Sequence, residues 1–241
     1  MNLAASVAGR FVPEGEGEVR TAFRRSCYVG FADGRYACIG DASLGRGPLN
    51  ALVTDFQLPA IGTRVALSVA SRWQPLALAP NPQIDIGALE YAARGRVPHE
   101  GFGGLIVGAH NSLSGHAQPA LEALENWLIG NALDDEAQML VGLGPGLTPS
   151  GDDYLGGMMV ALHALARDAR AAALWRWLQP RLAGRTSAIS AAHLAAAAEG
   201  EAHEALHRVL HGDAAPSVLD SVGHCSGWDA LAGAAAVLRI S

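Results

Sequence analysis

The sequence predicts an α+β protein, in which a β-rich N-terminal part, a small sheet or barrel, is followed by a mostly helical C-terminal part. Short β-leaning runs separated by Gly, Asp and Pro turn signals fill residues 1 to about 80. Helical periodicity dominates from about Asp85 onward. The proline-rich stretch from Pro75 to Pro82 separates the two parts. We therefore expect a β-rich domain over residues 1–82 and a helical domain over residues 83–241.

The β-rich part contains short predicted strands, and the pair Asp33-Gly34 is a turn signal between two of them. Hairpins that form a small sheet or barrel follow from this pattern. The predicted runs are Val19 to Phe31, Arg35 to Ile39, Ala51 to Phe56, Arg64 to Ala70 and Trp73 to Leu78.

The helical part contains eight segments with helical periodicity and capping signals. Between the first two, the glycine-rich stretch from Gly101 to Ser114 resists assignment. Its His110-Asn111-Ser112 triplet is expected in a polar loop, with a place in a pocket wall as the alternative. The predicted helices are Ile84 to Arg94, Pro119 to Ile129, Asp134 to Val141, Asp152 to Arg167, Ala171 to Leu182, Ser187 to Glu199, Glu201 to Leu210 and Gly227 to Leu238.

Composition and charge exclude several classes of protein. The chain is 50% hydrophobic but has no apolar run long enough to span a bilayer and no signal-peptide pattern. Its net charge of −6, with no basic patch, argues against nucleic acid or an anionic membrane as a partner. The three cysteines include no C-x-x-C pair, which suits a reducing cytoplasm. All 17 basic residues are arginine, which excludes P-loop kinases and enzymes that use a lysine Schiff base.

The helical part is organised around residues 142–153, which read Gly-Leu-Gly-Pro-Gly-Leu-Thr-Pro-Ser-Gly-Asp-Asp and lead into an apolar helix. So many glycines, prolines, hydroxyls and carboxylates exceed what a simple connection needs. Gly144, Gly146 and Gly151 would let the backbone approach a ligand closely or adopt positive φ. We expect the N–H groups at this helix start to bind a phosphate or a carboxylate, or to lie beside a metal held by the aspartates.

The alternative is a tight, well-capped helix start without a ligand. Ser150 is predicted to cap the helix, and Asp153 to complete a capping box. Capping alone, however, would leave Thr148 and Asp152 without a role.

The helix start has a second copy near the C-terminus. Ser150-Gly-Asp-Asp-Tyr-Leu-Gly-Gly aligns with Ser226-Gly-Trp-Asp-Ala-Leu-Ala-Gly, so that Asp153 corresponds to Asp229. Two helices packed about a pseudo-twofold axis, with their N-termini facing one pocket, would show such a pattern. Chance similarity between two capping boxes is the alternative. The pocket hypothesis places Thr148 and His224 at one cavity.

Three blocks in order resemble the AllH family, whose namesake is one subunit of the three-component oxamate carbamoyltransferase of bacterial anaerobic allantoin degradation, a route of purine catabolism. They are the segment 142–153, the segment from Thr186 to Gly200, and Gly223-His-Cys-Ser-Gly-Trp-Asp229. The blocks extend over about a hundred residues, and the first is highly specific. Residues 1 to about 110 fit the family's variable half only loosely.

The resemblance implies phosphorolysis of oxalurate to oxamate and carbamoyl phosphate, in a cytoplasmic complex with two other protein subunits. A non-catalytic anion-binding or assembly subunit is the alternative, and an oligomer is compatible with either. All the small molecules involved are anions, which helix N-termini with Gly, Thr and Ser donors bind without lysine.

The implied site combines residues from all three blocks. The cofactor stays open; a Mg²⁺ ion held by Asp152 and Asp153 against phosphate oxygens would overcome the repulsion between carboxylates and phosphate. Arg181 and Arg185 are the nearest cations in sequence. The candidates are Asp152, Asp153 and His224 for catalysis, and Gly144, Gly146, Thr148, Ser150, Gly151, Thr186, Ser190, Ser226, Gly227 and Asp229 for binding the anion.

A competing motif is His203-Glu204-Ala205-Leu206-His207, a literal H-E-x-x-H, the signature of zinc hydrolases. Such an enzyme needs a third ligand and an open position for water. No Glu follows Glu204, and His211 falls on the same helix. We therefore expect the match to be coincidental.

Overall fold

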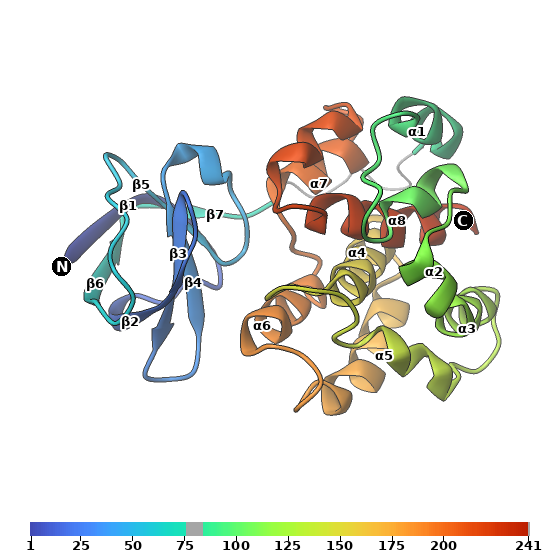
Figure 1. Ribbon diagram of the computed structural model, residues 1–241, viewed down its shortest axis with the longest axis horizontal. Helices are drawn as coiled ribbons and strands as arrows, with labels where there is room; N and C mark the ends of the chain where they lie inside the picture. Colours follow the sequence, from blue (N-terminus) through green and yellow to red (C-terminus); the bar gives the residue numbers. More distant parts are fainter. Residues whose placement is uncertain (76–83, 241) are drawn as a thin grey trace. The chain divides into compact units, whose positions relative to one another are not determined.

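The computed structural model describes residues 1–75 and 84–240, and the chain divides into two compact units. The first spans residues Met1–Leu76 and is built of strands, and the second spans Ala77–Ser241 and is helical (Figure 1). Each unit has its own hydrophobic core. The predicted α+β class is thus confirmed. The expected boundary at residues 82 and 83 lies outside the described residues.

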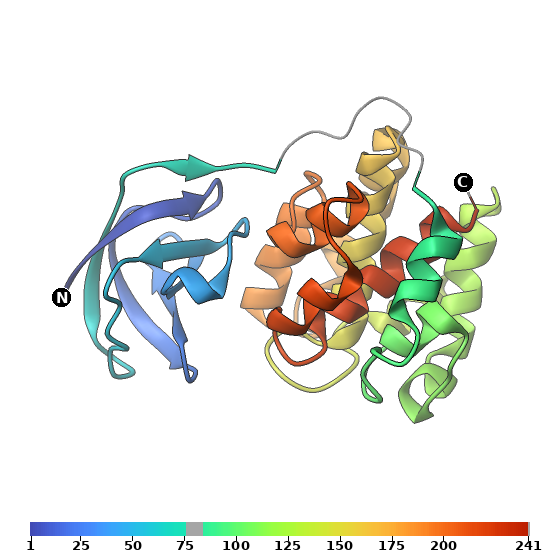
Figure 2. The same cartoon turned by 90° about the horizontal axis from the view of Figure 1, so that it is seen from above.

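The first unit is a closed six-stranded barrel (Figures 1 and 2). Hydrogen-bonded neighbours follow the order β1–β5–β4–β3–β2–β6 and return to β1, while the short β7 extends the barrel beside the end of β1. Small and branched apolar side chains fill the interior, so the barrel has a packed core. The strands are β1 Asn2–Gly9, β2 Gly15–Ala22, β3 Ser26–Phe31, β4 Tyr36–Gly40, β5 Asn50–Val53, β6 Arg64–Val69 and β7 Arg72–Trp73.

Two strand predictions need correction. The run Val19 to Phe31 is two strands, β2 and β3, because the chain turns between them and leaves Phe23 47% exposed. Strand β1 was not predicted, because its alternating buried positions are partly alanine, which has low β propensity. The Asp33-Gly34 turn is confirmed between β3 and β4, with Gly34 at φ 81°. Residues beyond 75 in the predicted run Trp73 to Leu78 lie outside the described residues.

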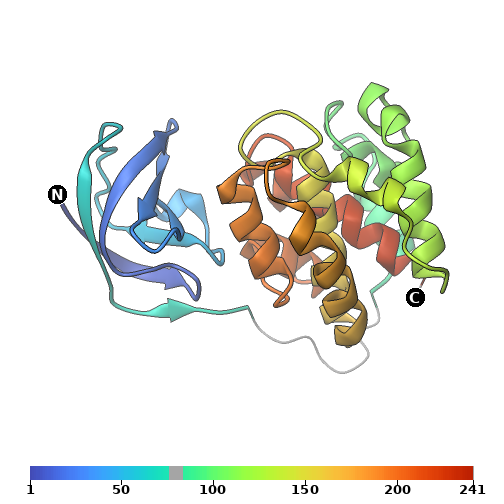
Figure 3. The same cartoon turned by 90° about the horizontal axis from the view of Figure 1, so that it is seen from below.

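The second unit is arranged around two central helices, α4 (Ser150–Ala164) and α8 (Ser226–Leu238), which lie between α6 and α3 (Figures 1 and 3). Both central helices are buried on nearly all sides, as their continuous apolar sequences predict. The other helices are α1 Ile86–Ala93, α2 Ser112–His116, α3 Gln118–Leu128, α5 Asp168–Leu178, α6 Ala188–Ala197 and α7 Glu204–Leu210, with short 3-10 turns at Gly103–Val107, Asp135–Leu140, Gln179–Arg181 and Pro216–Ser221.

Glycines allow α4 and α8 to cross at backbone contact. A Cβ on Gly157 would lie 1.8 Å from the Ala230 oxygen, and one on Gly233 would lie 1.9 Å from the Tyr154 oxygen. These residues occupy equivalent positions in the two copies of the internal repeat. The crossing is therefore symmetric about the axis that the repeat predicts.

Two helix predictions and one loop prediction need correction. Asp134 to Val141 forms a 3-10 helix, and Ala171 to Leu182 ends as an α-helix at Leu178, before Pro180. The expected polar loop over 101–114 contains a 3-10 turn and α2, which Asn111 begins through a capping box with Ser114. Among the described residues, no helix combines the length and the apolarity needed to cross a membrane.

Candidate functional site

The N-termini of α4 and α8 meet through their side chains. The hydroxyls of Thr148 and Ser226 lie 3.1 Å apart. Asp153 of α4 hydrogen-bonds Ser226 of α8, and Asp229 of α8 hydrogen-bonds Ser150 of α4. Each aspartate thus binds the first serine of the other helix. The two Ser-Gly turns lie together, which supports a pseudo-twofold repeat over a chance similarity of sequences.

The predicted capping boxes are wrong. Ser150 and Ser226 are the first helical residues, while Pro149 and Cys225 occupy the N-cap positions and make no side-chain caps. The physical reason is the crossing of the two helices. Asp153 and Asp229 each bond a serine hydroxyl of the facing helix instead of a backbone amide at the start of their own helix.

Asp152 ties the loop before α4 to the start of α6. The residue is only 1% exposed. Its Oδ1 accepts a hydrogen bond from the Gly142 amide at 2.8 Å, and its Oδ2 accepts from the hydroxyls of Ser190, at 2.6 Å, and Thr186. Three predicted site residues are therefore brought together. Ser187 caps α6 by accepting a hydrogen bond from the Ser190 amide.

The glycines of the loop differ in their surroundings. A Cβ on Gly151 would lie 2.0 Å from the Leu140 oxygen, and one on Gly227 would lie 2.9 Å from the Leu219 oxygen, so both permit close packing of backbone. Gly144 has φ 116° and lies against the Ser150 amide. Gly146, with φ 91°, has open space around it.

The exposed part of the loop offers free backbone donors. Within the described residues, the N–H groups of Gly144, Gly146, Leu147 and Thr148 donate no hydrogen bond. Such a row of unpaired amides next to a helix start suits an anion.

The two candidate arginines differ in their availability. Arg181 bonds Asp135 at 2.8 Å and covers the Trp177 ring. Arg185 is exposed, and no described residue forms an ion pair with it. Its carbonyl oxygen packs against Gly142 at the loop.

Asp153 and Asp229 place two buried carboxyl groups at the helix starts, and burial disfavours their charged forms. Burial raises the pKa of Asp229 to about 6, although hydrogen bonds from Phe102, Ser150 and Gly103 act in the opposite direction. Burial also raises the pKa of Asp153 well above its usual range, and the neighbouring charge of Asp229 adds to this effect. The Oδ2 oxygen of Asp153 is buried and has no partner within the described residues.

The loop before the Gly103–Val107 turn completes the surroundings of α8, and sequence reasoning missed it. The Phe102 amide donates to Asp229 Oδ1 at 2.5 Å, and a Cβ on Gly101 would lie 2.3 Å from that oxygen. Glu100 approaches the predicted site residue His224, with 3.0 Å between Oε2 and Nε2. The only sequence signal was the run of glycines near residue 101, which gives no indication of a partner 127 residues away.

The H-E-x-x-H histidines have structural partners. His203 caps α7 by accepting from the Ala205 amide, and His207 Nε2 accepts from the Ala202 amide at 3.0 Å. Burial lowers the pKa of His207 to about 4, and the nearby His211 and His203 lower it further. These hydrogen bonds give His203 and His207 structural roles that do not require a metal.

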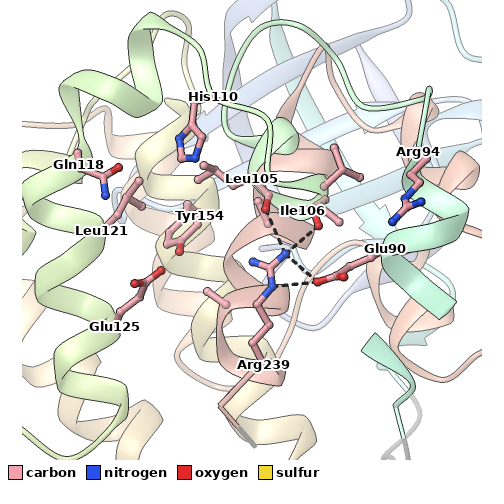
Figure 4. A pocket seen from close by; sticks show the side chains of 14 residues that line it. Glu90, Arg94, Leu105, Ile106, His110, Gln118, Leu121, Glu125, Tyr154 and Arg239 are labelled. Atoms are coloured by element: carbon pink, nitrogen blue, oxygen red, sulfur yellow. Dashed lines mark hydrogen bonds and ion pairs between the residues drawn. The ribbon is translucent and has the colours of Figure 1, made fainter. Parts of the chain in front are cut away.

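A cavity of about 450 Å³ lies elsewhere in the helical unit and contains none of the predicted site residues (Figure 4). Arg239 crosses it to bond Glu90 and the carbonyl oxygens of Leu105 and Ile106. Tyr154 lines it while remaining 2% exposed. His110 lines the cavity, as the pocket-wall alternative for its triplet expected. The other lining residues come from α1, the Gly103–Val107 turn, α3, α4 and α8, and no local pattern brings these segments together.

The fold and the site define a two-unit protein in which a β-barrel precedes a helical unit with paired helix N-termini. Residues 140–238, which include both N-termini, match the family described as oxamate carbamoyltransferase subunit AllH. This match supports the resemblance to the AllH family that the motifs indicate. The family name points to a subunit of oxamate carbamoyltransferase, and hence to other protein partners. No solved structure matches the chain.

Proposed function

We propose that this protein is a subunit of an oxamate-carbamoyltransferase-like enzyme and binds an anionic substrate or phosphate where the N-termini of α4 and α8 meet. The reaction would convert oxalurate and phosphate to oxamate and carbamoyl phosphate. The observation that carries the proposal is the junction itself. Two helix starts, joined through Thr148 and Ser226, lie beside a loop whose amide donors have no acceptor in the described part of the chain.

The three aspartates at the junction have hydrogen-bond partners within the helical unit, whereas the loop amides are left for an anion. Asp153 and Asp229 each bond a serine of the facing helix. Asp152 has three donors of its own. We propose that Asp152 positions the loop and does not react, and that the N–H groups of residues 144 and 146–148 bind the anion. Arg185, which forms no ion pair with a described residue, would assist them.

The binding step is tested with phosphate and the variant Gly146→Val. Gly146 has φ 91° and open surroundings, so valine would strain the loop conformation without colliding with the core. Isothermal titration should show phosphate binding to the wild type and at least about tenfold weaker binding to the variant, because a row of amides must align to share one anion. Circular dichroism should show unchanged helical content.

Gly212→Val is the matched control, because Gly212 also has positive φ, 76°, and no atom near its Cβ position. It should leave phosphate affinity unchanged. Equal affinity in the wild type and in folded Gly146→Val would remove the loop from the site.

A second candidate function is a non-catalytic anion-binding or assembly subunit. It is favoured by the extent to which the polar groups at the junction bind one another, since a reacting group must be free to engage substrate. Carbamoyl phosphate formation is measured with the protein alone and with its co-expressed partner subunits. Activity in isolation would exclude the second candidate. Activity that needs the partners but survives replacement of Asp153 and His224 would favour it.

A further inference from the structure

Three side chains with different metal-binding atoms converge at the start of α8. The Glu100 carboxylate, the His224 imidazole and the Cys225 thiol each offer one ligand atom, and these atoms all lie within 4.8 Å of one another. Glu100 Oε2 and His224 Nε2 are 3.0 Å apart. Ligand atoms around a tetrahedral zinc ion are about 3.5 Å apart, given metal–ligand distances of about 2.0–2.3 Å. Small side-chain rotations would therefore bring the three ligand atoms to the separations that a zinc ion requires.

The backbone that carries these ligands is fastened on both sides. The Asn111 side chain donates to the carbonyl oxygens of His99, at 2.9 Å, and Gly101, at 2.8 Å, on either side of Glu100. His224 and Cys225 are adjacent and immediately precede α8. The ligand side chains are thus held on ordered backbone, while Glu100 and His224 are 74% and 85% exposed and can turn toward an ion.

The surroundings carry negative charge that a cation would balance. The charged groups near Cys225 are Asp229, Glu100 and Asp153, all of them acidic. One oxygen of Asp153 is buried without a partner among the described residues. A divalent ion would stabilise the ionised forms of these carboxyl groups and the thiolate form of Cys225.

We infer that Glu100, His224 and Cys225 form a binding site for a zinc ion at the N-terminus of α8. A thiolate and an imidazole select zinc over magnesium, which prefers oxygen ligands in an octahedral arrangement. Three protein ligands leave the fourth tetrahedral position open for water or for an oxygen of a bound anion. This site differs from the predicted Mg²⁺ site at Asp152 and Asp153 and from the H-E-x-x-H motif.

The test uses full-length protein stripped with a chelator and titrated with ZnCl₂ and, separately, MgCl₂. One zinc ion should bind per chain, far more tightly than magnesium. Co²⁺ in place of zinc should give a thiolate-to-metal absorption band that disappears in Cys225→Ser. His224→Ala and Cys225→Ser should each weaken zinc binding at least about tenfold, since even the partners of ligands contribute 10–100-fold.

Three matched variants serve as controls. His116→Ala removes an exposed histidine, Cys38→Ala removes a cysteine buried in the barrel, and His207→Ala removes the H-E-x-x-H motif. All three should bind zinc as the wild type does. Absence of zinc binding, equal binding by folded His224→Ala and Cys225→Ser, or loss of zinc in His207→Ala would each overturn the inference.

The inference does not depend on the proposed reaction, and a phosphate titration separates the two. Zinc binding without phosphate binding would support the metal site and contradict the proposed anion site. Phosphate binding without zinc binding would support the proposed anion site and contradict the metal site. If both hold, zinc should tighten phosphate binding, because a cation bound beside the helix starts attracts the anion.

Discussion

Three aspartates lie at the helix junction, and their surroundings give them different properties. Asp152 accepts from three donors and joins the loop to α6. Burial raises the pKa values of Asp229 and Asp153, and one oxygen of Asp153 has no partner among the described residues. Adjacent or equivalent positions in sequence therefore do not imply equivalent chemistry.

At the residue scale, Asp229 should make stability depend on pH. Its pKa of about 6 in the folded protein exceeds the ordinary 3.8, so the native state holds the extra proton between these values. The free energy of unfolding should therefore fall as pH rises from about 4 to about 6, by roughly 2 kcal/mol. Asp229→Asn cannot ionise and should lack this contribution.

Urea unfolding of the wild type and Asp229→Asn at several pH values measures the effect, since contributions from other groups largely cancel in the difference. A difference in stability that stays constant between pH 4 and pH 7 would contradict the raised pKa.

Asp152 offers a second test at this scale. Asp152→Ala would leave the Gly142 amide and the hydroxyls of Thr186 and Ser190 without their acceptor. At about 1 kcal/mol for each, the free energy of unfolding should fall by about 3 kcal/mol. Asp135→Ala is the control, because it removes an exposed carboxylate paired with Arg181 and should change stability little. Urea unfolding of the two variants measures the difference. Similar losses of stability in Asp152→Ala and Asp135→Ala would contradict the role given to Asp152.

At the scale of elements, the α4–α8 crossing depends on two glycines. Gly157→Ala and Gly233→Ala would each bring a methyl group within 2 Å of a backbone oxygen of the facing helix. Because backbone cannot rotate away, each change should lower the free energy of unfolding by more than about 2 kcal/mol.

Gly156→Ala is a control on the same helix. Its methyl would lie 3.6 Å from the Ala197 side chain, an ordinary contact. It should preserve stability or raise it by up to about 1 kcal/mol, because alanine favours the helix. Chemical denaturation of all three variants tests the crossing, and equal stability of Gly157→Ala and Gly156→Ala would show that the helices lie further apart.

At the scale of the whole molecule, the two units have separate cores, and every candidate site residue belongs to the helical unit. A fragment of residues 77–241 should therefore fold by itself, because none of its core residues lies in the barrel. Circular dichroism should show cooperative thermal unfolding of a helical protein, and the fragment should bind phosphate as the full chain does. A fragment without a cooperative transition would show that the barrel is required for folding.

Local sequence patterns determined the α+β class, most helices and the resemblance to the AllH family, because period, turn residues and an unusual loop are properties of neighbouring residues. The repeat even indicated that two helix starts belong together. Only the tertiary structure decided which groups meet: that Asp153 and Asp229 bind the opposite helix, that Asp152 joins the loop to α6, and that Glu100 approaches His224 and Cys225. The physical reason is that burial and hydrogen-bond partners arise from packing between distant segments. Capping rules describe only the residues at one helix start, so they cannot predict a bond to a facing helix.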